Sequence, residues 1–571
     1  MKIWQAVLCT TLWLTGLVPA SALAGGESQN GTPFDLQGCI DQQLQAGSKH
    51  IVVPPGRYRV TPKNRQHLVL QNLNDLQIVA DGVEMVCTET TRALTISDCT
   101  NVTLRGLVID YDPLPFTQGR ITAMSADKRI HEIELFAGYP TAETVGNRKY
   151  EIFRPDTRTL RCDTLYPEKV EVVDSRHIRI TNPRGHADDT EHVGDPIVIA
   201  SQYAPHGVAS HAILCENDIH VRLENIAVFA SDSFGFWEMN CEGTVYYRCR
   251  IDRRPPTSDP VQRADPRLRS LNADAFHSTA ATKGPSYLEC AARFMGDDCI
   301  NICGDYHMIM SSQGKDLRVV AKHHLNIQPG DPVELVMYDG RRLPDAKAVS
   351  VQPAGSIRDE EQAFLAKQHL DPRLKTAHNA LHQAYTITLD RAVEIPMGGV
   401  ICATSRNGNG FTVKGCDFGF NRSRGILIKA SDGEVSSNRM EACWMSAILV
   451  APEYWWLEAG SSSNLKITGN TIIKCGGAAI SIEAIAGNGQ TAPAGIHRNI
   501  AITGNTITVS PLPNIQVVAT DGLQIENNTF QSPTFGKPSR HRPATTELVK
   551  TENCENATVQ HNVRYDCDLP H

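Results

Sequence analysis

The sequence predicts an all-β protein built as a parallel β-helix that carries inserted small β-barrel-like modules. Three late stretches are near copies of one another, each a short alternating strand with Gly or Asn at its end: residues 464–472, 499–507 and 522–530. Strand, sharp turn and strand at a recurring period are typical of a β-helix. With 571 residues the chain is long for one compact core, whereas a solenoid grows along one axis. A β-sandwich would need hairpin turns, and few signals for them are present.

The N-terminus is typical of a signal peptide over residues 1–24. A basic start is followed by a mostly apolar run, and Ala22-Leu23-Ala24 is a small-x-small cleavage site. We therefore expect an exported protein, periplasmic or secreted, without membrane attachment after cleavage. Residues 25–112 should form an N-terminal cap and the first coils, with an amphipathic helix over 35–46.

Two stretches interrupt the repeats. Residues 113–205 and 313–400 contain longer alternating strands joined by charged turns, which indicates antiparallel modules inserted into the helix. The coils between them, 206–312, should carry the catalytic groups, and 401–571 should form the C-terminal coils. Because the modules leave the helix on either side of the catalytic coils, we expect both to wall the same cleft.

Composition excludes some functions. The formal net charge is −8 and no basic run occurs, so a nucleic acid is not an expected partner. The chain has 17 cysteines, and several, such as Cys416 and Cys475, lie inside apolar strands. Buried small core residues are the expected state for most of them. No metal and no cofactor is predicted, and the oligomeric state stays open, a homodimer included.

Two short segments bring carboxylates to neighbouring coils. Asn272-Ala-Asp-Ala-Phe-His277 carries Asp274, and Gly296-Asp-Asp-Cys-Ile-Asn301 carries Asp297 and Asp298. Stacked coils would place the three together, and like charges in one patch raise at least one pKa. A protonated and an ionised carboxyl are what glycosidic hydrolysis requires. A Gly-Asp-Asp turn, or a calcium-binding turn, is the alternative.

Other polar and aromatic residues are candidates for binding a sugar. Aromatic faces stack on sugar rings, and Arg forks onto hydroxyls or carboxylates. The predicted substrate-binding set comprises His277, Arg293, Asn301, Arg424, Trp455, Trp456 and Glu458. For the arginines and tryptophans, a solvated turn or a structural aromatic is the alternative interpretation.

The residues resemble glycoside hydrolase family 110, the exo-acting α-1,3-galactosidases. The resemblance covers nearly all of the chain after residue 24, and five segments carry it: Tyr111-Asp-Pro-Leu-Pro-Phe-Thr-Gln-Gly119, Asn272 to His277, Gly296 to Asn301, Arg422-Ser-Arg-Gly-Ile-Leu and Trp456-Leu-Glu458. The Gly-Asp-Asp-Cys element also resembles the polygalacturonases, but their further His-containing motif is absent.

This resemblance implies a right-handed β-helix and an inverting, metal-independent enzyme that removes terminal α-1,3-linked galactose from branched blood-group B-like or linear glycans. Carried onto this chain, Asp297 or Asp298 protonates the leaving oxygen, and Asp274 activates water. The operative pair should then be about 6.5–9.5 Å apart. The alternatives are another polysaccharide-degrading β-helix, either a polygalacturonase-like hydrolase or a lyase, and a non-catalytic glycan-binding protein.

Overall fold

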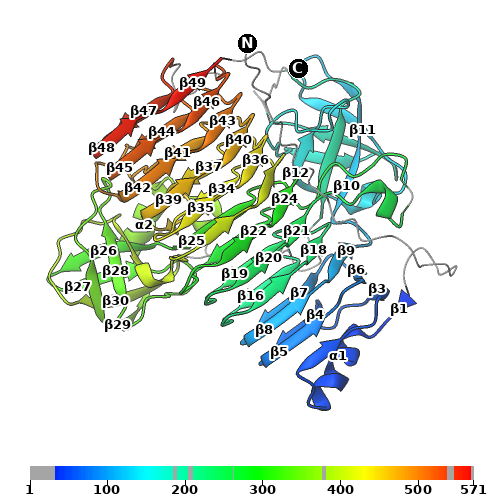
Figure 1. The fold of residues 1–571 in the computed structure, drawn as a ribbon, viewed down its shortest axis with the longest axis horizontal. Coiled ribbons are helices and arrows are strands. Elements are labelled where there is room, and N and C mark those ends of the chain that lie inside the picture. Colours follow the sequence, from blue (N-terminus) through cyan, green and yellow to red (C-terminus); the bar gives the residue numbers. More distant parts are fainter. Residues whose placement is uncertain are drawn as a thin grey trace, which may run out of the picture.

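The computed structural model confirms the parallel β-helix. Three long parallel sheets, one of 13 strands and two of 12, wind around one core (Figure 1). The structure describes residues 32–183, 190–202, 210–261, 263–375, 381–535 and 545–566. The predicted signal peptide lies outside these ranges.

One coil shows how the sequence builds the stack. The strands β22 (Phe276–Thr279), β23 (Ser286–Leu288) and β24 (Ala291–Arg293) each belong to a different sheet, and β25 (Ile300–Asp305) then lies beside β22. Each strand is short, so a turn follows within a few residues and sends the chain to the next sheet. Neighbouring coils pair in register, with Phe276 opposite Ile300. The position of a residue within its coil therefore fixes its neighbours above and below.

The core is formed by the inward half of each alternating strand. Phe276 and Ile300 are fully buried, and their neighbours in sequence point to the outer face. Aromatic rings stack along the axis here: Phe236 lies on Phe276 with centroids 4.8 Å apart, and Tyr246 lies on Tyr287 at 5.0 Å. All cysteines in the described residues except Cys39 and Cys554 are buried, which agrees with their expected place in the core.

A ladder of buried asparagines holds the C-terminal coils together. The side-chain oxygen of Asn470 accepts from the backbone N–H and the side chain of Asn438, both at 3.0 Å. The same contacts recur from Asn470 to Asn505, from Asn505 to Asn528 and from Asn528 to Asn562. Each asparagine satisfies turn amides of its neighbour, so the repeated Gly-Asn of the sequence serves as a structural element of the turn.

Two modules lie beside the coils (Figure 1). The first is a six-stranded antiparallel sheet: β10 (Phe116–Met124), β11 (Ile130–Leu135), β12 (Val145–Ile152), β13 (Lys169–Val172), β14 (His177–Thr181) and β15 (Pro196–Ser201). The second is a closed barrel: β26 (His307–Gln313), β27 (Asp316–Val320), β28 (Pro332–Val336), β29 (Ala346–Ser356), β30 (Gln383–Leu389) and β31 (Val400–Ala403). The barrel also carries the helices α2 (Asp359–Lys367) and α3 (Pro372–Lys375).

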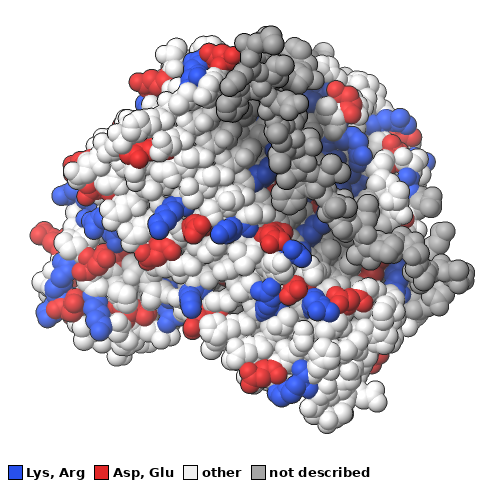
Figure 2. Space-filling model, in the orientation of Figure 1, with Lys and Arg blue, Asp and Glu red and all other residues white. Residues whose placement is uncertain are grey.

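At the N-terminal end, the predicted helix is present as α1 (Leu36–Gln45). Asp35 caps it by accepting from the backbone N–H of Gly38, and Leu36 and Ile40 are buried against the first coils. No helix among the described residues is long and apolar enough to span a membrane. On the face shown in Figure 2, acidic and basic side chains are interspersed in rows, so that face carries no extended basic patch.

Candidate active site

The site is built on the turns that precede three stacked strands. Asp274, Asp298 and Arg424 occupy the same position before β22, β25 and β34 (Ile426–Ile428). Backbone bonds fix this alignment, since the N–H of Ala275 donates to the carbonyl of Asp298 at 2.9 Å and that of Cys299 to the carbonyl of Arg424 at 3.2 Å. Side chains 24 and 126 residues apart in such turns are thus placed one rung apart.

Gly296 allows the Gly-Asp-Asp turn to lie close to the coil below. A Cβ at this position would come within 2.8 Å of the Asn272 carbonyl oxygen and 3.1 Å of the Lys149 Nζ. Asn272 is itself buried and donates to the Pro115 carbonyl at 3.0 Å, which ties the turn to the start of the first module. Asp297 and Asp298 therefore lie in a bend and not on an extended strand, so both carboxylates can reach one patch.

The three carboxylates form one cluster. Each offers an oxygen within 4.8 Å of an oxygen of the other two. The side chain of Asp297 is 31% exposed, whereas those of Asp274 and Asp298 are 7% and 2% exposed. The predicted separation of 6.5–9.5 Å is not found between nearest oxygens, because adjacent rungs of a β-helix bring their turns close together.

Burial and neighbouring charges give the three carboxyls different pKa values. Burial raises the pKa of Asp298, Arg424 opposes this rise, and the nearby Asp297 and Asp274 add to it, so that the pKa is about 7. Burial likewise raises the pKa of Asp274, against the hydrogen bond from His277. Burial would also raise the pKa of Asp297, but the cations of Arg422, Lys149 and Arg424 lower it below its usual range. Asp297 is thus ionised at neutral pH, whereas Asp298, with a pKa of about 7, can gain or lose a proton there.

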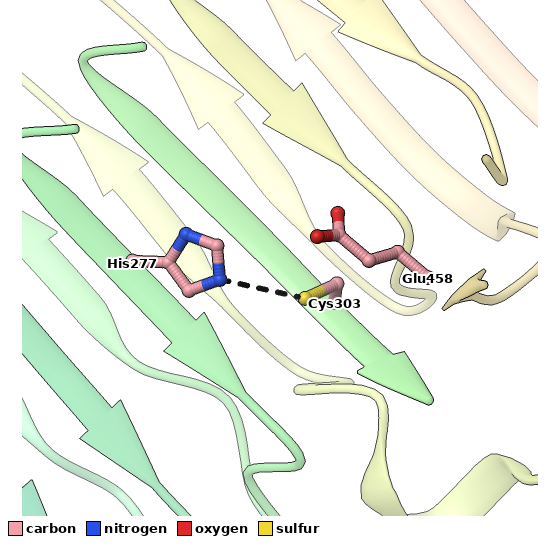
Figure 3. Close-up of side chains that lie close together, drawn as sticks. All are labelled: His277, Cys303 and Glu458. Atoms are coloured by element: carbon pink, nitrogen blue, oxygen red, sulfur yellow. Dashed lines mark hydrogen bonds between the residues drawn. The ribbon is translucent and has the colours of Figure 1, made fainter. Parts of the chain in front are cut away.

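His277 links this cluster to a second one. Its Nδ1 is 2.8 Å from Asp274, its ring stacks on Phe234 at 4.4 Å, and its Nε2 is 3.9 Å from the Cys303 sulfur. Figure 3 shows the ring pointing towards Cys303, with the Glu458 carboxylate beside them. Burial would lower the pKa of His277, but the bond to Asp274 raises it well above its usual value, so the imidazole is positively charged.

Glu458 lies among buried cations. Its Oε2 accepts from the fully buried Lys429 at 2.8 Å and from Asn301 at 3.3 Å. Burial would raise the pKa of Glu458, but Lys429, Lys322 and His277 lower it, so it is ionised. Lys429 also contacts Glu453 at 3.1 Å, and Glu453 is 3.7 Å from Arg424. Glu453 thus joins the two clusters on the Arg424 side.

Both modules contribute to the site. From the first module, Lys149 on β12 donates to the Gly296 carbonyl at 2.8 Å, and Asp163 accepts from Arg422 at 2.9 Å. Arg422 in turn contacts Asp297 at 3.3 Å. From the barrel module, Lys322 pairs with Asp305 at 2.9 Å. The predicted walls of the site are therefore supported by specific contacts on each side.

The structure places most of the predicted binding residues here, but not Arg293. His277, Asn301, Arg424 and Glu458 surround the carboxylates as described above. Arg293 ends β24 in a different sheet and pairs with Asp417 on the adjacent strand. No contact within the described residues joins Arg293 to the cluster, so the structure does not bring this predicted binding residue to the site. Arg293 is near the carboxylates in sequence, but its strand belongs to another sheet.

Trp455 and Trp456 lie at the tip of a short hairpin that ends in β38 (Glu458–Ala459). Their rings are half-buried and perpendicular to each other, with centroids 6.4 Å apart. Segments of the barrel module cover them, since His369 lies 4.4 Å from Trp455 and the Arg373 guanidinium lies 4.6 Å over Trp456. The pair therefore has structural partners in addition to its predicted role.

Sequence reasoning missed the lysines of the site. Lys429 could have been found, because it follows the strand Ile426–Ile428 in the coil position of Cys303. Lys149 and Lys322 belong to the modules and are brought in by tertiary packing, for which the local sequence has no signal.

Within the part of the chain that the structure describes, two groups offer the ligand types of a metal site: Asp274, Asp297 and Asp298, and His277, Cys303 and Glu458. Each already has cations at hydrogen-bonding distance. Arg424 contacts Asp298 at 2.9 Å, and Lys429 contacts Glu458 at 2.8 Å. These side chains provide the positive charge that a divalent ion would provide and would repel such an ion, so neither group fits a metal well.

Comparison with known proteins covers almost the whole chain. α-1,3-Galactosidase B of Bacteroides thetaiotaomicron is 24% identical, and the alignment spans 96% of this chain and 89% of that protein. α-1,3-Galactosidase A of Bacteroides fragilis is 21% identical over 87% and 84% of the two chains. The predicted resemblance to the α-1,3-galactosidase family is confirmed. The predicted enzyme class, a glycoside hydrolase, is confirmed with it.

The other comparisons concern the fold. The family described as "Right handed beta helix region" matches residues 396–530, which run from the last strand of the barrel module into the C-terminal coils. Among solved structures, the family 28 exopolygalacturonase of Yersinia enterocolitica aligns with a TM-score of 0.39 at 10% identity, over 91% of this chain and 75% of that one. A likeness at this level supports no argument about function.

Proposed function

We propose that this hydrolase removes terminal α-1,3-linked galactose from glycans, with inversion at the anomeric carbon. The observation that carries the proposal is its whole-length similarity to proteins named α-1,3-galactosidases. The cluster of Asp274, Asp297 and Asp298 supports it, because a carboxyl acid and a carboxylate base are the groups that such hydrolysis needs. Export through the predicted signal peptide would bring the enzyme to extracellular or periplasmic glycans.

The exposure of the three carboxyls suggests their roles. Asp297 is the one that a substrate meets first, since its side chain is 31% exposed, and we assign it as the general acid. In the reactive form Asp297 carries the proton and Asp298 is ionised. A bound sugar favours this form, because it displaces water around Asp297 and desolvation raises the pKa of that carboxyl. Asp274 and Asp298 lie behind it at equivalent turn positions and would together orient the attacking water. Because the carboxyls are close, that water lies beside the Asp274–Asp298 pair.

A neutral sugar fits the site better than a uronate. A uronate polymer requires cations that are free to bind its carboxylates. Four cations of the site already have carboxylate partners: Arg424 with Asp298, Lys429 with Glu458, Lys322 with Asp305 and Arg422 with Asp163. The fifth, Lys149, donates to the Gly296 carbonyl. Paired charges of this kind present hydrogen-bond donors and acceptors that suit hydroxyl groups.

The test is hydrolysis of α-1,3-galactobiose and of a blood-group B trisaccharide, with the anomer of released galactose followed by NMR. Early β-galactose is expected. Early α-galactose would establish a retaining mechanism. The short spacing of the carboxyls makes this the main alternative, since the two carboxyls of retaining enzymes are about 5–5.5 Å apart. Release from neither substrate would refute the proposed activity, and the ratio of the two rates gives the branched or linear preference.

A further inference from the structure

The outer face of β22 and β25 has two unlike ends. At the C-terminal end of β25, the strand β38 pairs antiparallel with it, with Asp305 opposite Glu458. Lys322 of the barrel module contacts Asp305 at the same place. At the other end, the side chain of Asp297, in the turn before β25, is 31% exposed, and that of Asp163, in the first module, is 46% exposed. One end is therefore covered by protein, and the other is open.

An exposed aromatic residue lies at the open end. Tyr166 of the first module is 62% exposed. It follows Asp163 by three residues, and Asp163 bonds Arg422, which contacts Asp297. Tyr166 is thus close in sequence to a residue that is linked through Arg422 to the proposed acid.

The backbone before Tyr166 is fixed to the module. Leu165 is 5% exposed and exchanges backbone hydrogen bonds with Tyr150 of β12, both at 2.9 Å. A rigid backbone that presents an aromatic face to solvent loses little entropy when a ring stacks on it.

We infer that Tyr166 forms the platform for the sugar that leaves, with the terminal galactose held between Asp297 and the closed end at Glu458. This orientation rests on the proposed function and deepens it. It makes the first inserted module the part of the chain that selects the leaving sugar. Cleavage at the chain end follows from the cover that β38 and Lys322 place over the far end.

The experiment separates the two sugar positions by changing the leaving group. α-Galactosyl fluoride carries galactose but no second sugar, whereas α-1,3-galactobiose carries both. For Tyr166→Ala we expect kcat/KM on galactobiose to fall about tenfold, mainly through KM, because one aromatic stacking contact is lost. The value on the fluoride should stay within about twofold of wild type, and Tyr166→Phe should behave as wild type on both.

The control is Tyr565→Ala, which removes a tyrosine of similar exposure, 53%, at the last strand. It should leave both substrates unaffected, and thermal midpoints should match for all variants. An equal loss on both substrates, or no loss on either, would overturn the role of Tyr166. If the wild-type enzyme hydrolyses neither substrate, the proposed function itself fails, which is a separate result.

Discussion

Two buried aspartates in this protein have pKa values that are shifted in opposite directions. Asp110 and Asp298 are each 2% exposed, so burial opposes the charge of both. Asp110 accepts hydrogen bonds from Arg267 at 2.9 Å and from Arg254 at 2.8 Å, and despite burial these lower its pKa to about 2. Asp298 has one arginine and two carboxylates for neighbours, and its pKa rises to about 7. The neighbouring charges, and not the depth of burial, decide whether a carboxylate is a structural ion pair or a group that exchanges protons.

The largest effect is expected at the cluster. Asp297→Asn removes the proposed acid and should reduce kcat/KM on galactobiose about 10³-fold, the usual contribution of a general acid. The loss should be much smaller on α-galactosyl fluoride, because fluoride leaves without needing a proton. Steady-state kinetics on both substrates measure this, and the thermal midpoint should stay near that of wild type.

The matched control is Asp417→Asn, which makes the same chemical change beside Arg293, outside the cluster. Near-full activity of this variant is expected. An Asp297→Asn enzyme that keeps its activity on galactobiose would remove Asp297 from the mechanism. Equal losses on galactobiose and the fluoride would instead indicate a role other than acid.

A substitution in the asparagine ladder should have the opposite effect to one in the carboxylate cluster: the protein should lose stability and keep its activity. Asn470→Ala removes an acceptor of two bonds from Asn438 and a donor to the Val435 carbonyl at 3.0 Å. Buried groups left unsatisfied cost about 1–3 kcal/mol each, so unfolding should become easier by about 3 kcal/mol. Urea unfolding followed by circular dichroism measures this loss.

The control in the same coil is Asn464→Gly, where the asparagine is exposed and has a positive φ of 57° that glycine accepts. Its cost should be below about 1 kcal/mol. Equal costs at the two positions would mean that the buried ladder adds nothing beyond the turn conformation.

The contrast also explains what the sequence could and could not predict. The ladder and the carboxylate turns repeat with the coil, so a periodic pattern identified both the fold and the cluster of Asp274, Asp297 and Asp298. The charges that set their pKa values come from elsewhere. Lys149 and Lys322 reach the site from inserted modules. Arg293 was expected at the site because it is near the carboxylates in sequence, but sequence proximity does not show which of the three sheets a residue belongs to.

The buried ion pairs of Asp110 should make the stability of the protein depend on pH. The pKa of Asp110 is lower in the folded protein, about 2, than in the unfolded chain, about 3.9, so its contribution to stability is present above pH 4 and is lost as the pH falls towards 2. Asp110→Asn should therefore destabilise the protein by about 2 kcal/mol at pH 6, and the difference from wild type should shrink at pH 3. Urea midpoints at the two pH values measure it; a difference independent of pH would assign the loss to packing.

The smallest effect is also the one that separates the roles of Asp297 and Asp298. With Asp298 acting beside Asp274 on the water, it must be ionised, so kcat/KM should fall about tenfold per pH unit below its pKa of about 7. Glu453 lies 3.7 Å from Arg424, and Glu453→Gln frees that arginine to stabilise the Asp298 carboxylate more strongly, which should move this limb to lower pH. A pH profile of kcat/KM for both enzymes measures it. If kcat/KM instead falls as the pH rises through 7, Asp298 supplies the proton and Asp297 is the base, because only a group needed in its protonated form loses activity in that direction.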